Sequence, residues 1–392
     1  MNIDNKWIRG ALPAFLIHIS IGMVYAWSML VEPIAAYINQ PQSKVQFAFS
    51  LAIFFLGMSA AFGGKVVEKN ISKSSLMSLI CFCGGLLVTA IAVYLKSLFL
   101  IYLGYGCLTG IGIGLGYITP IKTLMLWFKD QKGLATGIAV CSFGLASAVA
   151  SPLITVLLET ISLPKSFIAL AIIYSIPMWI AHNLIKKPKW YKEDIVNNYF
   201  NIKTLLHNSQ FILIWIMFFL NITAGLSLIS IASNLLKTSL SNISLIPMCI
   251  SIMGIFNGGG RLVFSAMSDK LKYRSAIYIF ITLISLLSIV EAFIIPQAIS
   301  IPIILIIISA CYGAGFSCLP SLLSDIFGID NISKIHGVSL TAWAAAGLVG
   351  NQISNLIYNL TGNYLSLFYV LIVIYLIEFI LSIIIHWRVK EK

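Results

Sequence analysis

The sequence predicts an all-α membrane protein with twelve transmembrane helices in two pseudo-symmetric six-helix bundles. Its 392 residues are 59% hydrophobic and 10% charged, which leaves too few charges to cover the surface of a soluble domain. Apolar stretches of about 20 residues or more recur along the whole chain, and a helix of this length spans a bilayer. Short sequence features also repeat between the two halves at spacings of 200 to 204 residues.

Each predicted helix is an apolar run bounded by polar or charged loops, which are mostly short. In the first half the predicted spans are 9–30, 44–64, 75–95, 98–128, 133–158 and 165–185. In the second half they are 209–236, 243–267, 275–295, 299–326, 335–359 and 364–387. The longest loop, residues 186–210, divides the chain. We therefore expect an N-terminal bundle over 1–185, a cytoplasmic linker over 186–208 and a C-terminal bundle over 209–392.

The distribution of lysine and arginine predicts the orientation in the membrane. Of the 25 cations, nineteen lie in the tails and in the loops on the same side as the N-terminus, and four lie in the loops on the other side. The positive-inside rule therefore places both termini in the cytoplasm, in a multi-pass protein of the cell's inner or plasma membrane. The net charge of +12 lies in short loops between apolar spans, so the expected partner is the lipid bilayer and not nucleic acid.

Two charged loops occupy equivalent places in the two halves, each after the second span. GKVVEKNISK starts at Gly64, and SAMSDKLKYR starts at Ser265, 201 residues later. Each loop has an acid, then a lysine, then a further cation: Glu68, Lys69 and Lys73 in the first, and Asp269, Lys270 and Arg274 in the second. Duplicated six-helix halves are the architecture of many secondary transporters, which bind substrate near the midplane between the halves.

These loops resemble the signature of the major facilitator superfamily, and the resemblance implies that they gate the conformational change. The first loop keeps Gly64 but has Glu68 for the usual aspartate, and the second keeps Asp269 but has Ser265 where glycine is expected. Within the superfamily the chain resembles the oxalate/formate antiporter family over nearly its full length. The matching stretches are GMVYAWSMLVEP (22–33), GIGIGLGYITP (110–120), WFKDQKGLATGIAV (127–140), FFLNITAGLSLIS (218–230), GGGRLVFSAMSDK (258–270) and LPSLLSDIFG (319–328). This resemblance implies the major facilitator fold and transport of small carboxylates such as oxalate, formate or pyruvate.

Arg261 lies in an otherwise uncharged run from Ser241 to Ser268. Seven residues of helix place it ~10 Å inside the membrane from Ser268, where a charge costs several kcal/mol without water, a partner or a ligand. One interpretation is a guanidinium that extends to the headgroups or binds the adjacent loop. We favour a carboxylate site, because the guanidinium can hold a carboxylate with two hydrogen bonds. We expect the three glycines at 258–260 to leave open space beside it.

Family members that exchange oxalate use an arginine in span 8 and a lysine in span 11. The resemblance matches the arginine to Arg261 but the lysine to Trp343, so the second cation is absent. Lys122 lies ~9 Å inside span 4, where it either snorkels to the headgroups or supplies that second cation, because span 4 faces the cavity in the superfamily. We therefore favour monocarboxylates such as formate, pyruvate or lactate, and oxalate:formate exchange through Lys122 remains the alternative.

Spans 1, 4, 10 and 11 line the cavity in the superfamily, and the resemblance therefore implies that their aromatic residues contact substrate. These residues are Tyr25, Trp27, Tyr117, Tyr312, Phe316 and Trp343. The alternative for each of them is ordinary packing. His18, near mid-depth in span 1, is either a packing residue or the best titratable candidate for proton coupling. Glu378 lies deep in span 12, which is peripheral in the superfamily, so we expect it to be protonated or paired structurally.

We therefore predict a secondary active transporter, antiporter or symporter, that moves small carboxylates by alternating access as a monomer. We expect neither cofactor nor metal nor enzymatic activity, because no HExxH, P-loop or nucleophile–base pattern is evident and the seven cysteines lack zinc-finger spacing. The alternatives are a major facilitator carrier of a non-carboxylate solute, a membrane enzyme, and a sensor or receptor.

Overall fold

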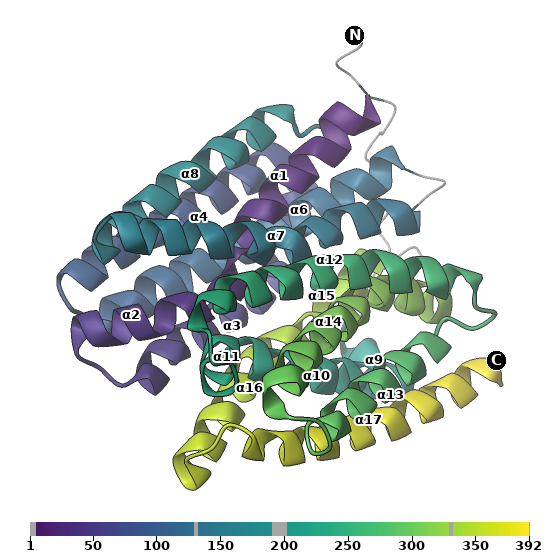
Figure 1. Ribbon diagram of the computed structural model, residues 1–392. Helices are drawn as coiled ribbons and strands as arrows, with labels where there is room; N and C mark the ends of the chain where they lie inside the picture. Colours follow the sequence, from purple (N-terminus) through teal and green to yellow (C-terminus); the bar gives the residue numbers. More distant parts are fainter. Residues whose placement is uncertain (1–4, 129–131, 190–201, 329–331, 392) are drawn as a thin grey trace.

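The computed structural model describes residues 5–128, 132–189, 202–328 and 332–391. All regular secondary structure in these ranges is helical (Figure 1). The helices run side by side across the view, and both chain termini lie at the right-hand end of this array. We call the right-hand end of the array the termini end and its left-hand end the opposite end.

The first half of the chain begins with a helix whose winding changes along its length. It consists of η1 (Trp7–Ala11), α1 (Leu12–Ile21), the 3₁₀ helix η2 (Gly22–Ala26) and α2 (Ser28–Ile38). The remaining helices are α3 (Gln42–Lys69), α4 (Ile71–Tyr94), α5 (Leu98–Ile101), η3 (Tyr102–Thr109), α6 (Gly110–Trp127), α7 (Lys132–Thr160) and α8 (Leu163–Leu184). Asn70 separates α3 from α4, and its side chain caps α4 by accepting a hydrogen bond from the backbone N of Lys73 at 2.9 Å.

The second half repeats this plan with a similar interruption of its first span. Its helices are α9 (Ile202–Leu206), α10 (Ser209–Ile229), α11 (Ala232–Ser239), η4 (Ile243–Leu245), α12 (Ile246–Lys270), α13 (Ala276–Glu291), α14 (Gln297–Phe327), α15 (Ile332–Ser339), α16 (Thr341–Thr361) and α17 (Ser366–Lys390). Asn208 caps α10 through hydrogen bonds from the backbone N of Gln210 and of Phe211. A polar side chain therefore starts a helix in each half.

The predicted helical membrane architecture is confirmed. Within the described residues, ten helical segments are long and apolar enough to cross a membrane. The other two predicted spans correspond to α13, which is apolar but only 16 residues long, and to α15 with α16. Asn351, Gln352 and Asn355 make α16 less apolar. The number of twelve crossings therefore remains a prediction.

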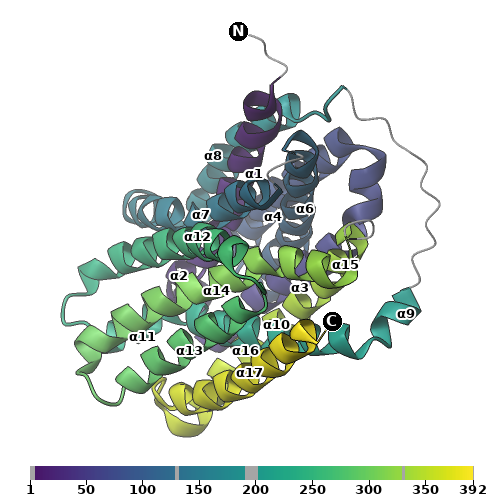
Figure 2. The same ribbon diagram turned by 90° about the vertical axis from the view of Figure 1, so that its right-hand side faces the viewer.

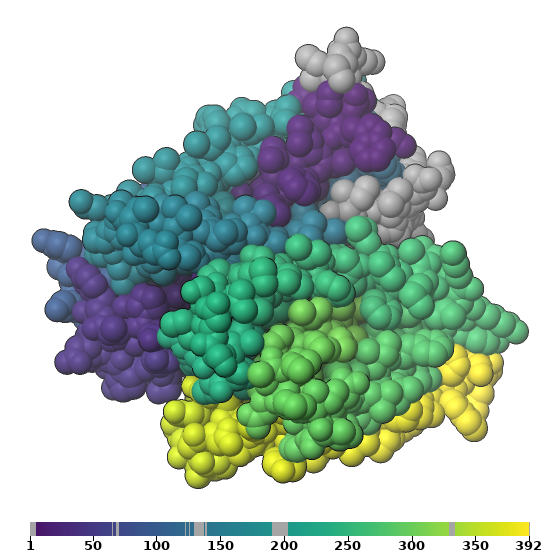
Figure 3. Space-filling view, in the orientation of Figure 1, coloured from purple at the N-terminus to yellow at the C-terminus, as the bar shows by residue number. Residues whose placement is uncertain are grey.

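Helices of the same half lie together, and two helix pairs make the most extensive contacts between the halves (Figures 1 and 2). We use N-terminal half for residues 5–189 and C-terminal half for residues 202–391. Helix α7 packs on α12, and α3 packs on α16. In the space-filling view the two halves meet along a seam (Figure 3). Much of the predicted linker, 186–208, falls outside the described residues, so the division into two bundles also remains a prediction.

Polar contacts tie the halves together at the opposite end. Glu32 on α2 and Lys237 on α11 form an ion pair. Ser233 Oγ donates to Ser28 Oγ at 3.2 Å, and this pair, like the ion pair, joins residues 205 apart in sequence. Asn234 Nδ2 donates to Gln42 Oε1 at 3.1 Å. Helices α2 and α11, which follow the interruptions of the two first spans, therefore face each other across the seam.

Candidate functional site

Arg261 points from the middle of α12 into the protein and is completely buried. Its neighbours Leu262 and Val263 are 39% and 56% exposed, so α12 turns its apolar side outward. One turn earlier, Asn257 orients the side chain, because Arg261 Nε donates to Asn257 Oδ1 at 2.8 Å. In this conformation the guanidinium does not extend to the headgroup region.

The two terminal nitrogens of Arg261 are buried and unoccupied. Neither Nη1 nor Nη2 has a hydrogen-bond partner among the described residues. The ion pairs among the described residues do not involve Arg261. An unsatisfied buried donor costs about 1–3 kcal/mol, and a charged one costs more. Two free N–H groups on one guanidinium match the two oxygens of a carboxylate.

Aromatic rings from both halves enclose this guanidinium. Its Cζ lies 5.2 Å from the ring centre of Phe316 on α14 and 5.7 Å from that of Phe143 on α7. Trp343 on α16 packs edge-to-face on Phe316, with ring centres 4.4 Å apart. Tyr117 on α6 packs edge-to-face on Trp343 at 5.2 Å. These rings attract the cation weakly and exclude water, so they strengthen its interaction with any anion.

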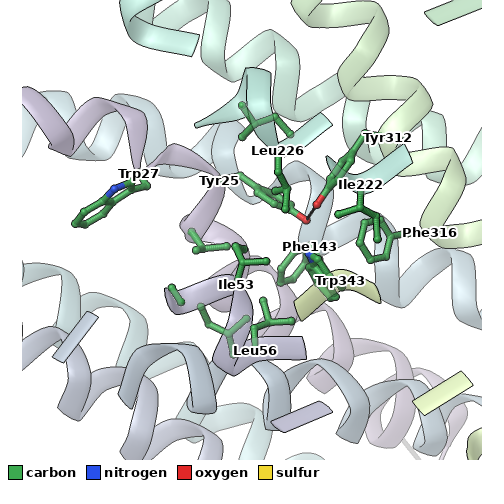
Figure 4. Packing of buried hydrophobic residues seen from close by; sticks show 14 of the residues in the cluster. Tyr25, Trp27, Ile53, Leu56, Phe143, Ile222, Leu226, Tyr312, Phe316 and Trp343 are labelled. Atoms are coloured by element: carbon green, nitrogen blue, oxygen red, sulfur yellow. Dashed lines mark hydrogen bonds between the residues drawn. The ribbon is translucent and has the colours of Figure 1, made fainter. Parts of the chain in front are cut away.

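A hydrogen bond between tyrosines joins the halves at this point. The hydroxyl oxygens of Tyr25 and Tyr312 lie 2.8 Å apart, and Figure 4 shows the bond beside Phe143, Trp343 and Phe316. Tyr25 reaches this position because η2 packs tightly on α7. A Cβ atom at Gly22 would lie 2.4 Å from the carbonyl oxygen of Phe143, so only glycine permits this approach.

His18 belongs to the same aromatic cluster. It is fully buried, and its ring packs edge-to-face on Tyr117 at 5.5 Å and on Phe143 at 6.1 Å. Its Nδ1 lies 3.0 Å from the carbonyl oxygen of Ala14, and its Nε2 has no partner among the described residues. We call the cluster of His18, Tyr25, Tyr117, Phe143, Arg261, Tyr312, Phe316 and Trp343 the central site.

Two expectations about the surroundings of Arg261 are wrong. Trp27 lies apart from the central site (Figure 4). It stacks on Tyr105 with ring centres 3.9 Å apart. The glycines do not leave open space beside Arg261. A Cβ at Gly258 would lie 2.6 Å from Leu145 on α7, and a Cβ at Gly260 would lie 2.3 Å from the carbonyl oxygen of Ala310 on α14. They are glycines because neighbouring helices touch α12 there, and only Gly259 faces free space.

Sequence reasoning missed two residues of this arrangement. Asn257 could have been predicted from the sequence, because it precedes Arg261 by four residues and residues four apart on a helix lie on the same face. Phe143 carries no such signal, since a phenylalanine in an apolar span resembles any packing residue. Lys122 lies on α6, but its side chain falls outside the described ones. The hypothesis of a second cation therefore remains a prediction.

In the second of the two predicted gating loops, an ion pair connects the loop to the end of α14. In the second loop, Arg274 binds Asp269 at 3.1 Å and also Asp325, from the end of α14, at 3.6 Å. Lys270 is exposed. In the first loop, Lys73 is exposed and Gly64 has no atom within 4 Å of the position of a Cβ. The side chain of Glu68 is outside the described ones.

Comparisons with known proteins agree with these features. The sequence profile of the Major Facilitator Superfamily matches residues 14–351. An uncharacterized MFS-type transporter of Escherichia coli (strain K12), YhjX, is 26% identical over 341 residues, which cover 85% of this chain and 83% of that protein. The oxalate:formate antiporter of Oxalobacter formigenes is 26% identical over 356 residues, which cover 89% of this chain and 84% of that protein. Apicoplast pyruvate carrier 1 of Toxoplasma gondii is 22% identical over 458 aligned positions, which cover 88% of this chain and 82% of that protein.

Proposed function

This chain belongs to the Major Facilitator Superfamily of membrane transporters, and we propose that it carries small carboxylate anions by secondary active transport. Two of its relatives are named for such cargo, the oxalate:formate antiporter and the apicoplast pyruvate carrier. Each aligns with 88% or more of the chain, so the similarity includes both halves. We further propose a monomer in the plasma membrane with cytoplasmic termini.

One observation carries this proposal: Arg261 is fully buried at the seam with two unpaired terminal nitrogens. A carboxylate would accept one hydrogen bond from each nitrogen and would neutralise the buried charge. The hydroxyls of Tyr25 and Tyr117 are carried by rings that both pack edge-to-face on Phe143, which lies beside the Arg261 guanidinium. They can therefore donate to the same anion.

The charge of the central site favours a monocarboxylate such as formate, pyruvate or lactate. Among the described side chains, Arg261 is the only permanent cation in the central site. The resemblance to oxalate exchangers matches their second cation to Trp343, which is uncharged and packs on Phe316. A second negative charge would therefore remain buried without a partner, at a cost of several kcal/mol. Oxalate:formate exchange requires Lys122 to reach the site, and this is our alternative proposal.

The same charge explains why transport would depend on a bound anion. Closing the halves around Arg261 buries an unpaired cation, which is unfavourable, whereas closing them around an ion pair is less so. Tyr25 and Tyr312 meet across the seam in this enclosed state. Binding a carboxylate therefore stabilises the state through which both halves pass during alternating access.

Counterflow in proteoliposomes tests this proposal. Vesicles are loaded with formate, pyruvate, lactate or oxalate, and uptake of the labelled anion is measured for the native protein and for Arg261→Ala and Arg261→Lys. We expect both variants to lose carboxylate exchange by roughly a hundredfold or more, because lysine keeps the charge but not the two-pronged geometry. Arg388→Lys, an exposed change at the end of α17, is the matched control and should exchange normally.

The result that would overturn the proposal is normal exchange by folded Arg261→Ala protein. Failure of the native protein to move any of the four anions would also overturn it. Lys122→Ala distinguishes the two cargo classes. Loss of oxalate exchange with formate exchange preserved would support Lys122 as a second cation.

A further inference from the structure

A buried carboxyl group lies away from the central site, within the C-terminal half. Glu378 on α17 is fully buried. Its Oε1 lies 3.1 Å from Asn221 Nδ2 on α10 and 2.9 Å from Thr282 Oγ1 on α13. Its Oε2 is also buried and has no partner among the described residues. Glu378 therefore joins three helices, α10, α13 and α17, through one carboxyl oxygen.

The hydroxyl of Thr282 indicates which form of Glu378 fits this geometry. Thr282 Oγ1 lies 2.6 Å from the carbonyl oxygen of Tyr278, which has no proton and can only accept. A hydroxyl has one proton, so Thr282 cannot donate to Tyr278 and to Glu378 at the same time. Both contacts are hydrogen bonds only when the carboxyl itself carries a proton and donates it to Thr282. The described arrangement therefore suits a protonated Glu378.

The other groups around Glu378 offer no counter-charge. The titratable side chains that face it are Tyr278 on α13, Cys311 on α14 and Tyr375 on α17. From α10 it meets the neutral amide of Asn221. None of these groups carries a positive charge, and the ion pairs of the described residues do not include Glu378. An ionised carboxylate in this position would be uncompensated and costly.

Glu378 is connected to the central site through Gly315 of α14. A Cβ at Gly315 would lie 2.3 Å from Asn221 Oδ1, so the amide that binds Glu378 rests directly on the α14 backbone. Tyr278 donates its hydroxyl to the carbonyl oxygen of Gly315 at 2.7 Å. The next residue of α14 is Phe316, which packs against the guanidinium of Arg261. Both neighbours of Glu378 therefore hold the segment that carries one wall of the central site.

We propose that Glu378 is a proton-binding site that couples carboxylate transport to protons, so that one proton moves with one carboxylate. This inference rests on the proposed function. Glu378 takes up a proton when the protein is open to one side and keeps it while the halves are closed. It releases the proton after the anion has left on the other side. Deprotonation leaves Thr282 with one proton for two acceptors, so it loses its bond either to Tyr278 or to Glu378. In our proposal this change, together with altered bonding of Asn221, shifts α14 with Tyr312 and Phe316.

Two assays on Glu378→Gln in proteoliposomes test the coupling. Glutamine is neutral and keeps the donor and acceptor pattern of a protonated carboxyl. We expect counterflow without a pH gradient to stay within about threefold of native, while formate or pyruvate uptake driven by a pH gradient falls at least about tenfold. The proton influx that accompanies uptake, read by a dye inside the vesicles, should fall equally. Glu159→Gln, an exposed glutamate near the end of α7, is the matched control.

Infrared spectroscopy of the native protein provides a measurement that does not depend on transport. A protonated carboxyl has a carbonyl band that an ionised one lacks, and we expect Glu378→Gln to remove one such band. If Glu378→Gln fails to fold, Thr282→Val takes its place. That variant keeps the carboxyl but removes its partner, so it should shift the band and the pH profile of exchange.

Several outcomes would overturn the inference. They are gradient-driven uptake unchanged in Glu378→Gln, no carboxyl band assigned to Glu378, and proton coupling lost in His18→Gln but kept in Glu378→Gln. Failure of the proposed function looks different, because the native protein would then not exchange carboxylates at all. The infrared band would still report whether Glu378 is protonated.

Discussion

The two halves bring different chemistry to the point where they meet. The C-terminal half supplies the buried ionisable groups Arg261, in the central site, and Glu378, away from it. The N-terminal half supplies neutral groups, among them Tyr25, Tyr117 and Phe143. The spacing of 201 residues that relates the two charged loops places Ala60, a buried alanine of α3, at the position equivalent to Arg261.

This difference shows how a duplicated framework can acquire separate roles. Both halves use an interrupted first span, a helix capped by an asparagine and a charged loop after the second span. In the proposed mechanism the C-terminal half binds the anion through its single cation, and the N-terminal half covers it with rings and hydroxyls. Three changes test this division of roles.

Disturbing the contact between α12 and α14 in the C-terminal half should have the largest effect. In Gly260→Ala the new methyl would meet the Ala310 backbone at 2.3 Å, and backbone cannot move aside as a side chain can. We expect a loss of about 1–3 kcal/mol or more in stability, seen as a lower unfolding temperature in detergent. Gly259→Ala, one residue earlier and with free space around it, should be as stable as native. Equal stability of the two variants would show that α12 does not depend on contact with α14.

Adding a second cation to the C-terminal half should change the cargo. Trp343→Lys puts an ammonium beside Phe316, where the resemblance to oxalate exchangers implies one. We expect the ratio of oxalate to formate exchange to rise by roughly tenfold, since a dianion would then find two cations. Trp343→Met, which has similar length without charge, is the control. A rise in both variants would mean that volume, and not charge, excludes oxalate.

Removing a hydroxyl from the N-terminal half should have the smallest effect. Tyr25→Phe deletes the hydrogen bond to Tyr312 but keeps the ring and its contact with Phe143. A neutral hydrogen bond contributes about 0.5–1.5 kcal/mol, so we expect KM for formate to change by ~3–10-fold with little change in stability. Tyr102→Phe, at the surface of the same half, is the control. A complete loss of exchange in Tyr25→Phe would show that the neutral half carries binding too, and the division of roles would fail.

The sequence by itself determined the helical membrane architecture, the ends of most helices and the unusual position of Arg261. These follow from hydrophobicity and charge, which are properties of short stretches of chain and need no knowledge of neighbours. Span boundaries such as 165–185 and 209–236 lie within a few residues of the structural helices α8 and α10–α11 for this reason. The Tyr25–Tyr312 contact could be expected only in outline, from the resemblance.

Only the tertiary structure decided which side chains meet Arg261. In a membrane helix both the lipid-facing side and the buried side are apolar, so periodicity does not show which way α12 is rotated. That rotation placed Gly258 and Gly260 against neighbouring helices and brought the guanidinium to Phe143. In the first span, Trp27 stacks on Tyr105 outside the central site. The contacts of Glu378 with Asn221 and Thr282 likewise join helices that are far apart in sequence. Their proximity depends on how whole helices pack, which no short stretch of sequence specifies.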